Sequence, residues 1–307
     1  MEGIPSPETR EREPEIRLQF FRHDEKAKTP KDADDARVRL TEVGRKNAEK
    51  VGEEHDINPE GTVIYGSPRD RSTETAYHRM MGEGGGLQDL ALEDLQQRGR
   101  NALQGEHPSY PEGKGPKKDA QKDALDFVFS GEFETIANKH YLESKDLLTF
   151  VFEESDKLAK ELGDTESRTY SRTAAEIAKL IKPYLETVLP RWQTLSKDKK
   201  YTNLNGRLER LFASHQTVTE SFLLKAVEVA EGREAARNLL GEFKSKNGFD
   251  FSEGYNITIK PPKEKNEEAV PTIELAYKQH RWNLTQAMLD RIIKEGSLEE
   301  TPADETK

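Results

Sequence analysis

The stretch from Ile16 to Glu25, IRLQFFRHDE, decides the fold, because an apolar strand here ends directly in charged residues. Apolar residues at 16, 18 and 20 alternate with polar ones, which is the two-residue period of a strand. The strand therefore delivers Arg22 and His23 at its carboxyl end. In an open α/β sheet the reactive crevice lies beyond the carboxyl ends of the strands. Arg22 and His23 are predicted to stand at such a crevice.

Two later strands end in residues of matching chemistry. The strand predicted over 62–65 is followed by Arg69 and Arg71, and the strand predicted over 208–213 is followed by His215. Strand ends that are far apart in the sequence converge at one edge of such a sheet. A neutral imidazole can attack phosphorus while guanidinium groups hold the dianion. The converging histidines and arginines therefore suit phosphoryl transfer.

The remaining pattern predicts an α/β fold, namely a three-layer α/β/α sandwich with a mostly parallel central sheet and an inserted helical cap. Helices are predicted to follow the three strands, with the periodicity of one apolar face. We expect one domain over 16–295 between disordered tails at 1–15 and 296–307. Within it we expect helices near 40–51, 72–81, 218–229 and 284–293, a helical insertion over about 117–195, and a hairpin of 255–259 with 272–276.

Composition limits the function classes. The chain has 307 residues, a formal net charge of −10 and no cysteine, and 35% of its residues are charged against 33% hydrophobic. The charge argues against nucleic-acid or membrane partners. Without cysteine there is no disulfide, thiolate nucleophile or Cys-bound metal centre. No stretch has the length of a signal peptide or a membrane span, so a cytoplasmic protein is expected.

Four short blocks together resemble the histidine phosphatase superfamily, which includes the cofactor-dependent phosphoglycerate mutases, and within it a bacterial type of member. The resemblance covers roughly the first 80 residues and the stretch around 208–230. It implies that His23 is phosphorylated, that Arg22, Arg71 and His215 surround the phosphoryl group, and that no cofactor takes part. The blocks are Arg22-His23, Leu40-Thr41-x-x-Gly44-x-x-x-Ala48, Ser67-Pro68-x-x-Arg71-x-x-x-Thr75-Ala76 and Ser214-His215.

Further phosphate contacts are expected from two cationic residues near these blocks. Lys26 is interpreted either as a phosphate ligand or as a solvated loop lysine. Arg69 is interpreted either as a third cationic arm or as a turn residue. Asp24 stands where the family most often has glycine. Its carboxylate would either oppose a bound phosphate or point away and orient a neighbour.

The general acid is harder to place. The family takes it from a loop after the second block or from the residue after the second histidine. That residue is Gln216, which cannot donate a proton as an acid. Glu93 is the preferred candidate and Glu83 the next, with a surface carboxylate as the plainer interpretation of either.

The predicted function is that of a phosphomonoesterase that acts through a phosphohistidine on His23 without a metal. A metal site built from His23, His215 and Asp24 is disfavoured, because the flanking arginines would repel a cation. The alternatives are a catalytically impaired phosphate-binding or scaffold protein of the same fold, and a phosphomutase. The substrate is expected to be a small phosphorylated molecule or a phosphoprotein, and the sequence leaves its identity and the oligomeric state open.

Overall fold

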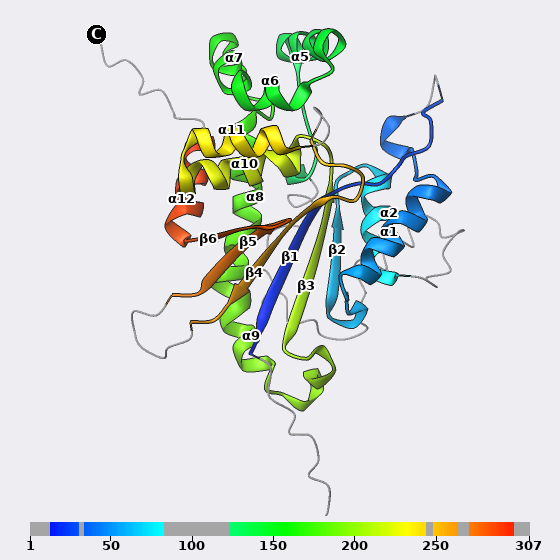
Figure 1. Ribbon diagram of the computed structural model, residues 1–307, viewed down its shortest axis with the longest axis vertical. Coiled ribbons are helices and arrows are strands. Elements are labelled where there is room, and N and C mark those ends of the chain that lie inside the picture. Colours follow the sequence, from blue (N-terminus) through cyan, green and yellow to red (C-terminus); the bar gives the residue numbers. More distant parts are fainter. Residues whose placement is uncertain (1–12, 31–33, 83–122, 244–247, 263–269, 298–307) are drawn as a thin grey trace, which may run out of the picture.

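A computed structural model of the chain describes residues 13–30, 34–82, 123–243, 248–262 and 270–297. Its centre is a six-stranded sheet in the order β2-β3-β1-β4-β5-β6 (Figure 1). The predicted strands are all present, each within about one residue of its expected bounds. They are β1 (Glu15–Arg22), β2 (Thr62–Gly66), β3 (Arg207–Ser214), β4 (Gly254–Lys260) and β5 (Thr272–Tyr277), to which the structure adds β6 (His280–Leu284).

The sheet is mixed, whereas the sequence predicted a mostly parallel one. Strands β2, β3 and β1 pair in parallel, and β4, β5 and β6 add to β1 by antiparallel pairing. Only two residues separate β5 from β6. A connection this short permits an antiparallel hairpin and no parallel crossover. The hairpin of β4 with β5 was predicted, and the antiparallel half of the sheet grows from it.

The end of the chain corrects one predicted boundary. The last helix was expected over 284–293, but Leu284 closes β6 and the helix α12 runs from Gln286 to Gly296. In β6 the buried Trp282 and Leu284 alternate with the exposed Arg281 and Asn283. This alternation is the strand period, and it is too short to stand out beside the longer helical pattern.

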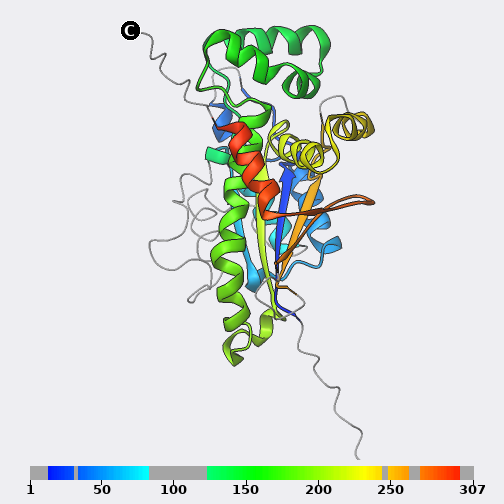
Figure 2. The same cartoon turned by 90° about the vertical axis from the view of Figure 1, so that its left-hand side faces the viewer.

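Helices cover both faces of the sheet, which confirms the predicted α/β sandwich (Figure 2). One face carries α2 (Asp70–Met81), with α1 (Glu42–Glu54) packed on it. The other face carries α8 (Tyr170–Pro183), α10 (Val218–Glu231) and α12, which pack on one another. Side chains of β1 alternate between the two layers, since Phe20 joins the larger core on the α10 side and Phe21 the smaller core on the α2 side.

A row of four rings fixes the register at the centre of the sheet. Tyr65, Phe212, Phe20 and Tyr255 lie on β2, β3, β1 and β4, and each faces its neighbour across the strand pairs. The rings of Phe20 and Phe212 stack with centroids 4.5 Å apart, and the other two neighbouring pairs stack at 4.9 and 5.4 Å. Such pairs add to the stability that burial supplies. Phe20 and Phe212 of this row stand three residues before His23 and His215, respectively.

The region of the predicted helical insertion divides between two places. The helices α5 (Gly131–Ser144), α6 (Leu147–Glu153) and α7 (Ser155–Leu162) gather beyond the carboxyl ends of β1 and β3 (Figure 1). The helix α8 lies in the layer on the sheet, followed by α9 (Leu189–Leu195). Residues 117–122, the predicted start of the insertion, lie outside the described residues, and the domain bounds stay a prediction.

The other elements are short or peripheral. They are the 3-10 turns η1 (Asp35–Arg37), η2 (Pro59–Gly61) and η4 (Lys199–Leu204), the π-turn η3 (Tyr184–Val188) and the helix α11 (Arg233–Glu242). The helix α1 begins as expected, because the Thr41 hydroxyl caps it by accepting from Gly44 N at 3.0 Å. No helix in the described part of the chain has the length and apolar character needed to cross a bilayer.

Candidate functional site

His23 leaves β1 in a state suited to nucleophilic attack. Its Nδ1 lies 2.7 Å from the carbonyl oxygen of Asp24. A carbonyl only accepts hydrogen bonds, so Nδ1 carries the proton and Nε2 keeps its lone pair. Burial first, and then the positive charges of Arg71, Arg22 and Lys26, lower the pKa of His23 to about 3. The imidazole is therefore neutral near pH 7, and its lone pair is on Nε2, which accepts a hydrogen bond from Arg71 Nε.

His215 meets His23 at the carboxyl edge of the sheet. The two rings have centroids 5.1 Å apart. His215 Nε2 lies 2.6 Å from the Ser67 hydroxyl, while its Nδ1 is buried without a hydrogen-bond partner in the described part of the chain. Burial first, and then the neighbouring His23 ring and the cations Arg71, Arg69 and Arg22, hold the pKa of His215 well below its usual range. The ring is thus neutral in the unliganded protein, and a bound dianion would favour its protonated form.

Arg71 reaches His23 from the first turn of α2. Its Nε lies 3.2 Å from His23 Nε2, and its Nη1 and Nη2 donate to the backbone oxygen and the carboxylate of Asp35 at 2.8 and 3.0 Å. The side chain is almost completely buried. Helix α2 places it there because Gly66 lets the strand end approach closely, with Thr73 N only 2.5 Å from where a Cβ of residue 66 would lie.

Arg22, the residue before His23, is held by the segment of Phe249 and Phe251. Its Nη1 donates to the Phe249 carbonyl at 2.6 Å and its guanidinium carbon lies 4.7 Å from the centre of the Phe251 ring. Its Nε is buried and has no hydrogen-bond partner among the described residues. Glu220, fully buried on α10, accepts from Phe249 N at 2.7 Å and so holds the segment that anchors Arg22. Burial raises the pKa of Glu220 to about 7.

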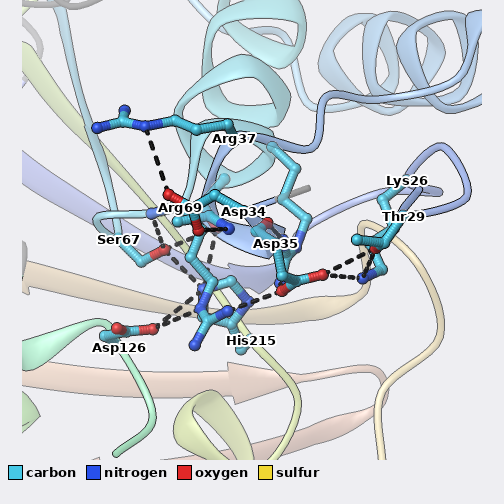
Figure 3. Close-up of polar contacts among 12 residues, drawn as sticks. Lys26, Thr29, Asp34, Asp35, Arg37, Ser67, Arg69, Asp126 and His215 are labelled. Carbon is cyan, nitrogen blue, oxygen red and sulfur yellow. Dashed lines mark hydrogen bonds and ion pairs between the residues drawn. The ribbon is translucent and has the colours of Figure 1, made fainter. Parts of the chain in front are cut away.

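Lys26 and Arg69 also lie at the site, where both pair with the carboxylate of Asp35 (Figure 3). Asp35 binds Lys26 through Oδ1, and its Oδ2 lies 2.8 Å from Arg69 Nη1 and 3.0 Å from Arg71 Nη2. Burial alone would raise the pKa of Asp35, but the hydrogen bond from Lys26 and the charge of Arg71 outweigh it and lower the pKa. Asp35 lies in a polar loop among other carboxylates, and nothing in its sequence context indicates this role.

The Asp24 carboxylate accepts hydrogen bonds that hold the end of β1 in place. It accepts from Glu25 N at 2.7 Å, Asn47 Nδ2 at 2.6 Å and Ser252 Oγ at 2.5 Å. These three donors tie the strand end to α1 and to the segment before β4. Of the two expectations for Asp24, the structure selects the one in which the carboxylate orients its neighbours.

The structure brings to the site a carboxylate that the sequence did not single out, Asp126. Glu93 and Glu83 lie outside the described residues, so their role stays a prediction. Asp126 Oδ1 lies 3.0 Å from Arg69 Nε and 3.5 Å from His215 Nε2 (Figure 3). Its segment is anchored because the Ser214 hydroxyl donates to the Leu125 carbonyl at 2.5 Å. A carboxylate that adjoins both a histidine and an arginine of the site is well placed to exchange a proton with a bound ligand.

The fold and these residues define a class: an α/β protein with two buried, neutral histidines and several cations at the carboxyl edge of its parallel strands. No family model matches the chain. No curated protein matches it either.

Solved structures with a similar course of the chain include three examples from two groups of organisms. Mycobacterial hydrolase 2 is 10% identical, with 92% of this chain and 97% of that chain covered and a TM-score of 0.45. A mycobacterial glucosyl-3-phosphoglycerate phosphatase is 11% identical, with 89% and 100% covered and a TM-score of 0.41. Phosphoserine phosphatase from Entamoeba histolytica, in complex with 3-phosphoglyceric acid, is 15% identical, with 89% and 99% covered and a TM-score of 0.36.

Two of these three proteins are named as phosphatases. The likeness concerns the fold alone at such identities. What the site does is argued below from its own side chains.

Proposed function

We propose that the chain is a phosphomonoesterase that works through a phosphohistidine on His23, without a metal. The observation that carries the proposal is a neutral His23 whose Nε2 accepts from Arg71 Nε and whose ring centroid lies 5.1 Å from that of His215. Two buried nitrogens, Arg22 Nε and His215 Nδ1, have no hydrogen-bond partner among the described residues. Unpartnered buried polar atoms are costly, and a phosphoryl group would satisfy both. The surrounding arginines and Lys26 favour an anion over a metal cation in this place.

The first chemical step is attack on phosphorus. The Nε2 lone pair of His23 forms the N–P bond while the bond from phosphorus to the ester oxygen breaks. Arg22 and Arg71 remain charged and can hold the equatorial oxygens through the transition state. The departing oxygen takes a proton from Asp126, which must enter this step in its acid form. The products of the step are the free alcohol and phosphohistidine.

The second step returns the protein to its starting state. Water attacks the phosphorus of phosphohistidine and the N–P bond breaks, which restores the neutral imidazole. Asp126, now a carboxylate, accepts the proton that the attacking water loses. Inorganic phosphate then leaves. The Asp24 carbonyl keeps the His23 proton on Nδ1 throughout, so that Nε2 is the atom that reacts in each cycle.

Hydrolysis of p-nitrophenyl phosphate with EDTA present tests the nucleophile. His23→Asn should abolish turnover and the acid-labile phosphate that the wild-type protein retains after rapid quenching. His280→Asn is the matched control, because His280 lies on β6 and pairs with Glu242 away from the site. Full activity in His23→Asn, or equal loss in the control, would refute the proposal.

A change of leaving group tests Asp126. For an alkyl phosphate, Asp126→Asn should lower kcat by about 10²-fold or more, the usual size of acid catalysis. For p-nitrophenyl phosphate the loss should be much smaller, because nitrophenolate departs without a proton. Equal losses for both substrates would show that Asp126 only positions Arg69 and His215.

A second candidate function is phosphate binding without turnover, on a scaffold of this fold. The observation that favours it is the carboxylate of Asp35, which already pairs with three cations of the site. Phosphate that protects the wild-type protein against heat, with no hydrolysis of any ester, would support it. In either case we propose a small phosphorylated molecule or a phosphoprotein as the partner, and a cytoplasmic location.

A further inference from the structure

One edge of the Arg71 guanidinium is shared between His23 and Asp35. The Nε of Arg71 lies 3.2 Å from His23 Nε2, and its Nη2 lies 3.0 Å from Asp35 Oδ2. Nε and Nη2 form one side of the planar group, the fork with which arginine grips two oxygens of a phosphate. An oxygen of Asp35 therefore stands beside the nucleophilic nitrogen, along the edge that would hold a phosphoryl group.

The same carboxylate takes up the other cations at this place. Oδ2 of Asp35 also accepts from Arg69 Nη1 at 2.8 Å, and Oδ1 accepts from Lys26 and from Thr29 Oγ1. Three positive charges thus converge on one negative charge. Asp126 also pairs with Arg69, so two carboxylates meet three cations at this place. The group keeps an excess of positive charge, which a phosphoryl dianion would neutralise more completely.

Asp35 is placed so that it can leave. It lies on η1, a turn of three residues, and its side chain is 38% exposed. By contrast, Arg71 is held by α2 and is almost completely buried. Replacement of Asp35 by another anion at these cations therefore requires movement of the short exposed turn η1. The sheet and α2 can stay in place.

We propose that the Asp35 carboxylate occupies the place of the ligand phosphoryl group in the free protein and is displaced when that group binds. Asp35 is thus an internal competitor that sets how tightly the site holds anions. The inference rests on the proposed function only in taking a phosphoryl group as the ligand. It concerns binding, so it is tested without turnover.

Calorimetric titration with inorganic phosphate, near neutral pH, compares the wild-type protein with two variants. Asp35→Asn keeps the shape of the side chain and removes its charge. Asp34→Asn is the matched control, because it removes the same charge from the neighbouring residue. The Asp34 carboxylate caps η1 and, among the described residues, pairs only with the exposed Arg37. The control thereby corrects for the general field of the loop.

Asp35→Asn should bind inorganic phosphate at least about tenfold more tightly than the wild-type protein, because the apparent affinity rises with the fraction of molecules whose site is open. Asp34→Asn should bind it as the wild-type protein does. If Asp35→Asn does not fold, Asp35→Ser replaces it with the same expectation. Binding no tighter than in the wild-type protein, or an equal gain in the control, would overturn the inference.

This outcome is separable from that of the proposed function. Tighter phosphate binding by Asp35→Asn in a protein that hydrolyses no ester would refute the phosphatase and leave the competitor in place. Hydrolysis that depends on His23, with no gain of phosphate affinity in Asp35→Asn, would do the reverse.

Discussion

Glu74→Gln should destabilise the protein by removing a buried charge on which the loop above the site depends. Glu74 lies on α2 with no exposed surface. Its two oxygens accept from Arg39 Nε and Nη2 at 2.9 Å each, from Arg45 Nε at 2.8 Å and from Leu40 N at 2.8 Å. Arg39 and Leu40 adjoin the turn that carries Asp35, so this carboxylate fixes that loop to the helix of Arg71.

The magnitude follows from these contacts. Breaking a buried ion pair by removing one partner costs about 3–5 kcal/mol. The guanidinium groups of Arg39 and Arg45 are 29% and 22% exposed, so water can partly replace the lost partner. We therefore expect a loss of about 3 kcal/mol of unfolding free energy, or roughly 6–10 °C in Tm for a domain of this size.

Urea and thermal unfolding measure this loss directly. Glu42→Gln is the matched control, because Glu42 is an exposed carboxylate on α1 that pairs with Lys46, and its loss should leave the midpoint unchanged.

Burial alone would raise the pKa of Glu74, but the hydrogen bonds from Arg39 and Leu40 N outweigh it and lower the pKa. Its contribution is therefore present at neutral pH and lost as the pH falls through the lowered folded pKa. A loss below about 1 kcal/mol would refute the reasoning that the buried charge organises the loop.

Two further predictions concern the buried histidine and the sheet. Unfolded histidine titrates near 6.5 and His23 near 3, so the unfolded state binds more protons as the pH falls from 7 to 4, and thermal melts should show stability falling by up to about 1.4 kcal/mol per pH unit for this group. In His23→Asn that slope should be smaller, and an unchanged slope would contradict the pKa. Gly254→Ala should lower the unfolding free energy by about 3 kcal/mol or prevent folding, because its Cβ would lie 1.9 Å from the Phe20 carbonyl oxygen. Gly241→Ala is the control and should not destabilise the protein, because nothing lies within 4 Å of its Cβ. Solubility and urea midpoints of the two variants measure the difference.

Local patterns in the sequence were sufficient for the elements that carry the site. The alternation around Phe20 predicted β1, and the polar residues that follow it placed Arg22 and His23 at a strand end. The convergence of three strand ends then followed from the rule that parallel strands share one carboxyl edge. These inferences succeed because period, capping and strand direction are properties of neighbouring residues.

Contacts between distant segments were decided by the tertiary structure alone. Asp126 and Asp35 are two of 58 acidic residues, and nothing near them in the sequence distinguishes them from carboxylates on the surface. Their roles arise because the segment after residue 122 is bound to the end of β3, and because Lys26, Arg69 and Arg71 are brought to one turn. Whether a histidine is neutral or a carboxylate is paired depends on burial and on charges within a few ångströms, and the chain sets those distances only when it is folded.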